Sequence, residues 1–249
     1  MMSAGRALLV LVRPSGIIEH GRKGKRRAIS MKILERSKSI GIRAVNSLLD
    51  PVERVFAPRK SAFAFPPVFI IGAPRSGSTL LFQTLVNAYR FGYLSNLHCL
   101  CYGFPYLLQV LVGRRLPDVN SSYTSTYGYI EGLSSPSECG EFWYRWFRRR
   151  PQYIPLEEID LAGLRSLRQV LIGLTDTFGL PLLFKNMPCA LRLQPLSAIL
   201  PEARFLFVRR HALWTAQSIL FARLQVHGNK ATWWSMEPPN VESLRNLPP

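Results

Sequence analysis

The stretch Val68-Phe-Ile-Ile-Gly-Ala-Pro-Arg-Ser-Gly-Ser-Thr-Leu-Leu81 decides the fold of this chain. Its first five residues form a short, apolar run rich in β-branched side chains, as in buried parallel strands. The residues from Ser78 to Ala88 carry apolar side chains at helical spacing, with Ser and Thr near the start. A strand, a glycine-bearing turn and a helix in this order predict a site for a phosphate-like anion.

The turn differs from the loop of nucleotide triphosphatases in its charged residue. Gly72, Gly77 and Thr79 match the pattern G-x-x-x-x-G-K-[ST], but Ser78 stands where that pattern has its lysine. Arg75 places a positive charge inside the loop instead, and no nearby carboxylate is positioned to hold Mg²⁺. The loop therefore favours transfer without a metal site. A P-loop kinase or ATPase is the alternative, and it predicts Mg²⁺-dependent ATP binding.

The segment from Gly72 to Leu81 resembles the P-[RK]-[SG]-G-[ST]-T loop of sulfotransferases that use 3′-phosphoadenylyl sulfate (PAPS), in their tyrosyl-protein and bacterial carbohydrate types. The resemblance covers about residues 66 to 240 and is most specific at two phosphate motifs. It implies that five consecutive loop residues bind the 5′-phosphosulfate of PAPS: Arg75, Ser76, Gly77, Ser78 and Thr79.

A second motif follows a later strand. PAPS carries a 3′-phosphate, so its binder needs a second anion site with a fixed cation and a hydroxyl donor. The segment Arg204-Phe-Leu-Phe-Val-Arg-Arg210 ends in two arginines, and Ser218 lies eight residues further on. It resembles the family segment R-[DN]-P-x5-S, which implies that Arg210 and Ser218 bind the 3′-phosphate. His211 and Ala212 replace the usual residues, which leaves Arg209 as an alternative contact.

Sulfuryl transfer needs cations on the migrating group and a base for the acceptor hydroxyl. Arg75 supplies one cation, and Lys185 resembles a strand-end lysine of cytosolic sulfotransferases. The family's catalytic bases do not carry over, because Met187 replaces the histidine and no glutamate lies between Tyr93 and His98. We select Glu138, which opens a predicted helix near Trp143. The alternatives are three other groups of the region: His98, Glu131 and Glu141.

Strands at 68–72, 182–185 and 203–208 alternate with helices at 78–88, 191–200 and 213–224. Two further helices are expected at 138–148 and 156–178, with loops and short helices at 92–135. This order predicts an α/β fold, a P-loop-type three-layer domain with a mostly parallel sheet flanked by helices. We expect residues 63–249 to form this domain and residues 1–62 to be a basic, partly disordered or helical N-terminal arm.

The net charge of +17 is uneven, because residues 1–60 contain fourteen Lys/Arg and four Asp/Glu. Such a balance suits nucleic acid, an anionic membrane surface or an anionic ligand. We expect no nucleic-acid partner; the rival nucleic-acid binder predicts affinity that falls steeply with salt. The arm, with the run from Arg22 to Arg27, has a possible peripheral contact with anionic membrane. The apolar run Ala7 to Val12 is shorter than a signal or spanning helix, which favours a cytoplasmic protein.

The four cysteines show no zinc-ligand spacing and no disulfide framework, so reduced thiols are expected. Thirty-one residues follow Ser218, fewer than in most family members, so we expect a domain that is incomplete at this end.

The sequence thus predicts a sulfotransferase that moves a sulfuryl group from PAPS to a hydroxyl of a carbohydrate or other small acceptor. Seven aromatic side chains either stack on the sugar rings of an acceptor or pack in the core. They are Tyr123, Tyr127, Tyr129, Trp143, Trp146, Trp233 and Trp234. The alternative is a catalytically inactive nucleotide-binding or membrane-associated scaffold, which any PAPS-dependent sulfation would exclude.

Overall fold

The computed structural model describes residues 23–113, 123, 125 and 127–246, with the backbone alone at 23–39. The chain divides into two compact units, residues 1–41 and 42–249. The run from Ala7 to Val12 lies outside the described residues, and so do the side chains of the basic run at 22–27.

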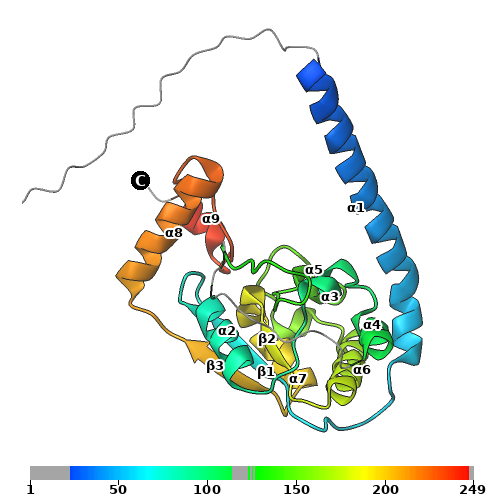
Figure 1. The fold of residues 1–249 in the computed structure, drawn as a ribbon. Helices are drawn as coiled ribbons and strands as arrows, with labels where there is room; N and C mark the ends of the chain where they lie inside the picture. The colour runs from blue at the N-terminus through cyan, green and yellow to red at the C-terminus, as the bar shows by residue number, and fades with distance from the viewer. Residues whose placement is uncertain (1–22, 114–122, 124, 126, 247–249) are drawn as a thin grey trace, which may run out of the picture. The chain divides into compact units, whose positions relative to one another are not determined.

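A parallel sheet forms the centre of the second unit (Figure 1). Its strands are β1 (Val68–Gly72), β2 (Leu183–Lys185) and β3 (Arg204–Val208), in the order β2-β1-β3. Ile70 is in register with Lys185 on one side and with Leu206 on the other. Gly72 ends β1 with φ 151°, and a Cβ atom there would lie 2.5 Å from the Val208 carbonyl oxygen. Only glycine permits this close approach of β1 and β3.

Both faces of the sheet are covered by helices. Phe69 and Ile71 of β1 pack on one face with leucines of α6 (Leu161–Phe178). Ile70, which points the opposite way, packs with Phe82 of α2 (Ser78–Ala88). This alternation along a strand, with apolar partners on both sides, makes three layers. The predicted fold class, a parallel sheet flanked by helices, is confirmed.

Several of the remaining helices differ in extent from those that the sequence predicts. The helix expected at 138–148 is wrong in extent: α5 spans only Gly140–Trp143, since its apolar residues pack into the core from a series of tight turns. The helix expected at 156–178 is a 3₁₀ turn, Leu156–Glu158, and then α6, which Asp160 caps by accepting bonds from two backbone amides. The other helices are α3 (Asn96–Leu100), α4 (Pro105–Val112), α7 (Leu193–Ile199), α8 (Ala212–His227) and α9 (Val241–Arg245), and a second 3₁₀ turn spans Met187–Leu191.

The helix α1 (Lys23–Phe56) enters the second unit with its later residues. Asn46 and Glu53, which belong to the stretch that the sequence assigns to the arm, are buried there. Glu53 Oε2 accepts hydrogen bonds from the Tyr106 and Leu107 amides, and Arg145 Nη1 lies 3.1 Å from its Oε1. Burial, which outweighs the nearby arginine, raises the pKa of Glu53 to about 7.

The helix α8 and the strand β3 contribute little to the core. Phe207 of β3 is 68% exposed, and Trp214 and Phe221 of α8 are exposed as well. The buried residues of α8 are Thr215 and Ala222. In the part of the chain that the structure describes, no helix is long and apolar enough to span a bilayer.

Candidate functional site

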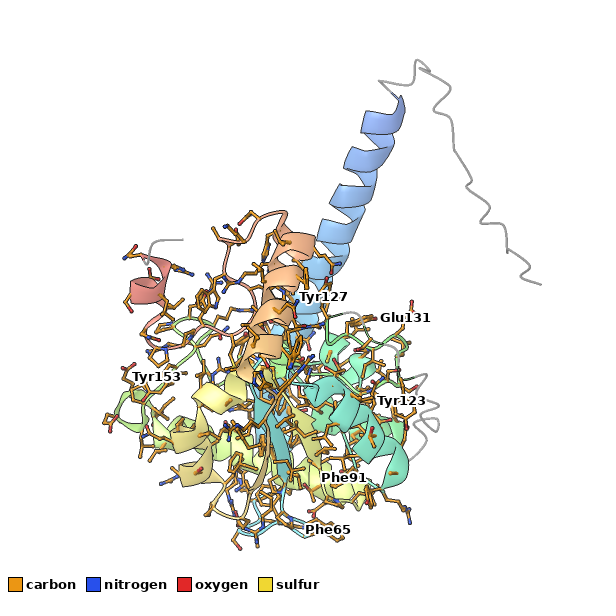
Figure 2. All side chains as sticks on the ribbon, turned by 90° about the vertical axis from the view of Figure 1, so that its left-hand side faces the viewer. Phe65, Phe91, Tyr123, Tyr127, Glu131 and Tyr153 are labelled. Atoms are coloured by element: carbon orange, nitrogen blue, oxygen red, sulfur yellow. The ribbon has the colours of Figure 1, made fainter. Side chains whose placement is uncertain are left out.

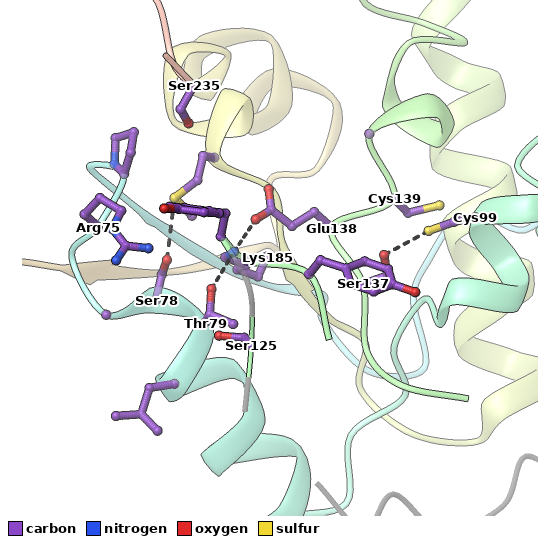
Figure 3. Close-up of a pocket in the computed structure, with 18 of the residues that line it drawn as sticks. Arg75, Ser78, Thr79, Cys99, Ser125, Ser137, Glu138, Cys139, Lys185 and Ser235 are labelled. Carbon is purple, nitrogen blue, oxygen red and sulfur yellow. Dashed lines mark hydrogen bonds and ion pairs between the residues drawn. The ribbon is translucent and has the colours of Figure 1, made fainter. Parts of the chain in front are cut away.

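The carboxyl ends of the three strands meet at one edge of the sheet, as parallel pairing requires. β1 leads into the loop 73–77, β2 ends at Lys185, and β3 runs into Arg209 and Arg210. A cavity of about 700 Å³ opens at this edge (Figure 3). Residues that follow all three strands and residues of several other segments line it, among them Arg75, Thr79, Glu138, Lys185, Arg210 and Trp234. The sheet thus gathers segments that are far apart in sequence.

The loop after β1 has the backbone conformation of an anion cradle. Arg75 and Gly77 both have positive φ, 66° and 96°, which is uncommon for arginine. The loop turns so that α2 begins at Ser78. The first backbone amides of α2 have no intrahelical partners. The Ser76 hydroxyl is buried without a hydrogen-bond partner among the described residues. Such an unsatisfied group beside a helix N-terminus fits a phosphate-like ligand.

Arg75 connects the loop to the second predicted phosphate motif. Its Nε donates to Ser218 Oγ of α8 at 2.9 Å. Arg210 Nη1 donates to the Arg75 carbonyl oxygen at 3.0 Å. Arg75, Arg210 and Ser218 therefore lie together. Arg209 is exposed, as Arg210 is, but is not among the residues that line the cavity. Ser76 and Ser218 are not among the residues that line the cavity, and Ser218 reaches the site through Arg75.

Lys185 is a buried cation, 3% exposed, rather than a surface lysine. Its Nζ donates to Thr79 Oγ1 at 2.9 Å and forms an ion pair with Glu138 Oε1 (Figure 3). A buried ammonium is costly unless such partners compensate for lost hydration. The hydroxyl of the loop, the cation and the carboxylate therefore form one connected group.

Glu138 is held at the cavity by its backbone. Its carbonyl oxygen accepts from Asn186 Nδ2 at 3.2 Å, and the preceding Ser137 amide donates to Leu94 O at 2.9 Å. The side chain is 32% exposed, and Oε2 has no hydrogen-bond partner among the residues described. Gly128, with φ 94°, passes directly over the pair: a Cβ atom there would lie 2.9 Å from Glu138 Oε1 and 3.3 Å from Lys185 Nζ.

The sequence of this unit matches a family model described as the sulfotransferase family over residues 66–246. The chain belongs to the sulfotransferase family.

A solved structure, that of a sulfotransferase from Mycobacterium avium, is similar with 16% sequence identity and a TM-score of 0.45. The match covers 73% of this chain and 50% of the Mycobacterium avium protein, so the chain spans about half the length of that protein. No curated protein sequence matches this chain.

The other titratable candidates occupy different places in this chain. His98 is buried: its Nδ1 accepts from the Ser95 amide and its Nε2 bonds to Gln109 Oε1 at 3.0 Å. Burial lowers the pKa of His98 to about 4, so the ring is neutral and structural. Glu131 is exposed at the edge of the molecule (Figure 2). Glu141 lines the cavity and pairs with Arg149.

Five of the seven aromatic candidates fall into two groups. Trp143 and Trp146 pack in the core with Phe142, which is the alternative role that the sequence offered for these aromatic side chains. Tyr127, Tyr129 and Trp234 line the cavity instead, and the Tyr127 ring meets the Trp234 ring edge-on at 5.8 Å. The Arg75 guanidinium lies 5.5 Å from the centre of the Tyr127 ring. The aromatic wall therefore borders the arginine of the loop.

Sequence reasoning missed several residues of the site. Gly128, Asn186 and the thiols of Cys99 and Cys139 are all at or near the cavity, yet none belongs to a phosphate motif. Gly128 was the residue most open to prediction, since a glycine is common where the backbone has a positive φ or approaches other groups closely. In the described segments no group of three or more His, Cys, Asp or Glu side chains is placed to hold a metal ion.

Proposed function

We propose that this chain transfers a sulfuryl group from PAPS to a hydroxyl of a carbohydrate or another small acceptor. One observation carries the proposal: the loop 73–79, Lys185 and the pair Arg210 and Ser218 converge at one edge of the sheet. Members of the family generally use PAPS as donor. In this proposal the two motifs supply the two anion sites that PAPS needs. The hydrogen bond between Arg75 and Ser218 joins the two sites.

In the proposed donor site, the backbone amides at the start of α2 and the hydroxyls of Ser76, Ser78 and Thr79 bind the 5′-phosphosulfate. Gly77 gives the loop its positive φ and lets the backbone approach the anion. Arg210 and Ser218 bind the 3′-phosphate. No side chain in this set requires a metal ion, because fixed cations and amides supply the positive potential.

In the proposed transfer step, the acceptor hydroxyl oxygen bonds to sulfur while the bond from sulfur to the bridging oxygen breaks. Arg75 and Lys185 stabilise the charge that develops on the sulfuryl group and on the bridging oxygen. Glu138 takes the proton of the acceptor hydroxyl, for which Oε2 is available. The products are the sulfate ester and adenosine 3′,5′-bisphosphate.

The acceptor is proposed from the cavity wall. Tyr127, Tyr129 and Trp234 provide aromatic surface beside Glu138, and such surface suits the apolar face of a sugar ring. A cavity of about 700 Å³ has room for one sugar-sized group next to the donor.

The donor site is tested by thermal unfolding with adenosine 3′,5′-bisphosphate, compared with AMP and with ATP plus Mg²⁺. Binding shifts stability by roughly RT ln(1 + [L]/Kd), so micromolar affinity is visible at millimolar ligand. We expect selective stabilisation by the bisphosphate, reduced in Arg210→Ala. Stabilisation by ATP plus Mg²⁺ alone would support a P-loop kinase or ATPase.

Turnover is tested with [³⁵S]PAPS and a panel of mono- and oligosaccharides, phenols and tyrosyl peptides. Labelled saccharide is the expected product, and a labelled peptide in its place would overturn the acceptor class. Binding of the bisphosphate without any labelled product would favour the inactive nucleotide-binding scaffold.

We further propose that the enzyme is cytoplasmic and that residues 1–60 contact anionic membrane. The concentration of basic residues there supports the second point. Sedimentation with phosphatidylserine vesicles, at low and high salt and with residues 1–41 deleted, tests it. Equal binding to neutral vesicles would contradict it.

A further inference from the structure

Two thiols lie against each other in the wall of the cavity. Cys99 belongs to α3, and Cys139 directly follows Glu138. Cys99 Sγ donates to Ser137 Oγ at 3.1 Å, which places this thiol beside the segment that carries Cys139. Figure 3 shows their sulfur atoms on the same side of the segment that carries Glu138. Both residues line the cavity, but Cys99 is half-buried whereas Cys139 is 3% exposed, so Cys99 is the thiol that a small molecule in the cavity reaches first.

The two thiols differ in acidity. The neighbouring Cys139 thiol and then the hydrogen bond to Ser137 lower the pKa of Cys99, against the opposing effect of burial. The pKa of Cys139 is raised well above the ordinary value, chiefly by burial. Because Cys99 is the more exposed of the two thiols and the thiolate is the nucleophile, Cys99 is the group that attacks an oxidant, and Cys139 is the neighbouring thiol that completes the reaction. Redox-sensing cysteines often combine a lowered thiol pKa with a neighbouring cysteine that resolves the mixed disulfide.

We propose that Cys99 and Cys139 form a redox modification site, which closes to a disulfide on reaction with a low-molecular-weight disulfide such as oxidised glutathione. The Cys99 thiolate attacks one sulfur of that disulfide and releases one thiol. The Cys139 sulfur, as thiolate, then attacks the mixed disulfide at the Cys99 sulfur and releases the second thiol. The two cysteines lose two electrons and two protons, and the small disulfide gains them.

The new bond displaces the segment that bears Glu138. A disulfide holds its sulfur atoms at about 2.05 Å, nearer than a hydrogen bond does. Cys99 has little freedom to move, since α3 is fixed by the capping contacts between Ser95 and the buried His98. The adjustment therefore falls on residues 137–139. Glu138 then shifts relative to Lys185, whereas Arg75 and Ser218 keep their contact.

For catalysis this inference rests on the proposed function. If Glu138 is the base, the disulfide lowers the transfer rate by about tenfold or more, since small misplacements of reacting groups are costly. Affinity for adenosine 3′,5′-bisphosphate stays within about twofold, because the phosphate contacts of the proposed donor site do not involve the moved segment.

The test uses the full chain with mixtures of oxidised and reduced glutathione, trapped with a thiol-alkylating reagent and mapped by peptide mass spectrometry. We expect a peptide pair joined through Cys99 and Cys139 that reduction with dithiothreitol removes. Cys99→Ser abolishes the pair, and Cys101→Ser, which changes a cysteine of the same segment, retains it. Because Cys139→Ser alters a buried position, the wild-type map is the primary readout and does not depend on any variant.

A link between Cys99 and Cys101, or glutathione attached to Cys101 alone at every ratio, would overturn the proposal. Bisphosphate binding is measured on the same samples. A disulfide that forms in a protein without bisphosphate binding or transfer would leave the modification site in place and refute the proposed function. Bisphosphate binding and sulfuryl transfer in a protein that forms no disulfide would support the proposed function and refute the modification site.

Discussion

Arg75 Nε donates a hydrogen bond to Ser218 Oγ at 2.9 Å, across 143 positions of sequence. The contact joins the loop after β1 to the helix after β3, so the two phosphate motifs meet at one arginine. In the proposed function Arg75 belongs to the 5′-phosphosulfate and Ser218 to the 3′-phosphate. A nucleotide that carries both groups therefore engages both partners of this bond, and a nucleotide with a single phosphate engages only one of them.

Ser218→Ala removes the hydroxyl from this contact. We expect affinity for adenosine 3′,5′-bisphosphate to fall by about ten- to 150-fold, which corresponds to the loss of one hydrogen bond to a charged group. Affinity for AMP changes little. Isothermal titration with both ligands measures the difference, and Ser243→Ala on the exposed helix α9 is the control. An equal loss for the two ligands would show that Ser218 does not distinguish the 3′-phosphate.

Glu138→Gln tests the proposed base while it keeps the shape of the side chain. The amide cannot accept the proton of the acceptor hydroxyl, so the single-turnover transfer rate is expected to fall by about 10² to 10⁴. Bisphosphate affinity is retained. Glu141→Gln is the matched control, because Glu141 lines the same cavity but pairs with Arg149. If the control lost the rate and Glu138→Gln did not, the role of base would pass to Glu141.

Gly128→Ala tests whether the backbone over the ion pair sets its position. The new methyl group would meet Glu138 Oε1 at 2.9 Å, in a residue whose φ is 94°. We expect a transfer rate lower by about tenfold and a stability loss of about 1 to 2 kcal/mol from the left-handed backbone.

Gly132→Ala is matched to this change, since Gly132 has φ 105° and its Cβ would lie 2.9 Å from Ser135 Oγ. The control loses similar stability and keeps its transfer rate, as steady-state assays at saturating PAPS would show. Transfer rates lowered equally in the two variants would mean that backbone strain alone, and not the contact with Glu138, explains the loss of rate.

The strand, loop and helix at 68–88 follow from the sequence because their signals are local. The apolar run, the glycines and the helical spacing lie within a few residues of one another, and the structure has β1 and α2 at the expected positions. The contact between Glu138 and Lys185 joins residues 47 positions apart, and that between Gly128 and Glu138 depends on a loop path. No periodicity contains such information. The helix predicted at 138–148 failed for a related reason, since its buried aromatic residues follow the shape of the core rather than a helical repeat.

Glu53 gives the fold a pH dependence whose sign follows from its burial. Its pKa is about 7 in the folded protein, against 4.5 for an unperturbed glutamate. Below pH 4.5 both states are protonated and the stabilisation is fully present; it is lost as the pH rises through about 7, because the folded state must then ionise a buried carboxyl group. The size of this contribution is about 3 kcal/mol. His98 acts in the opposite direction, since its lowered pKa of about 4 removes stability as the pH falls below 6.5.

Glu53→Gln keeps the hydrogen-bonding shape at the start of α4 and cannot ionise. We therefore expect the wild-type free energy of unfolding, relative to that of the variant, to decrease by about 3 kcal/mol between pH 4.5 and pH 7. The variant itself loses stability on acidification, because the effect of His98 is no longer opposed. Urea unfolding at a series of pH values measures both trends, with Glu131→Gln at the exposed edge as the control. A constant difference between wild type and Glu53→Gln across this range would show that Glu53 is ionised in the fold and that its contact with Arg145 outweighs its burial.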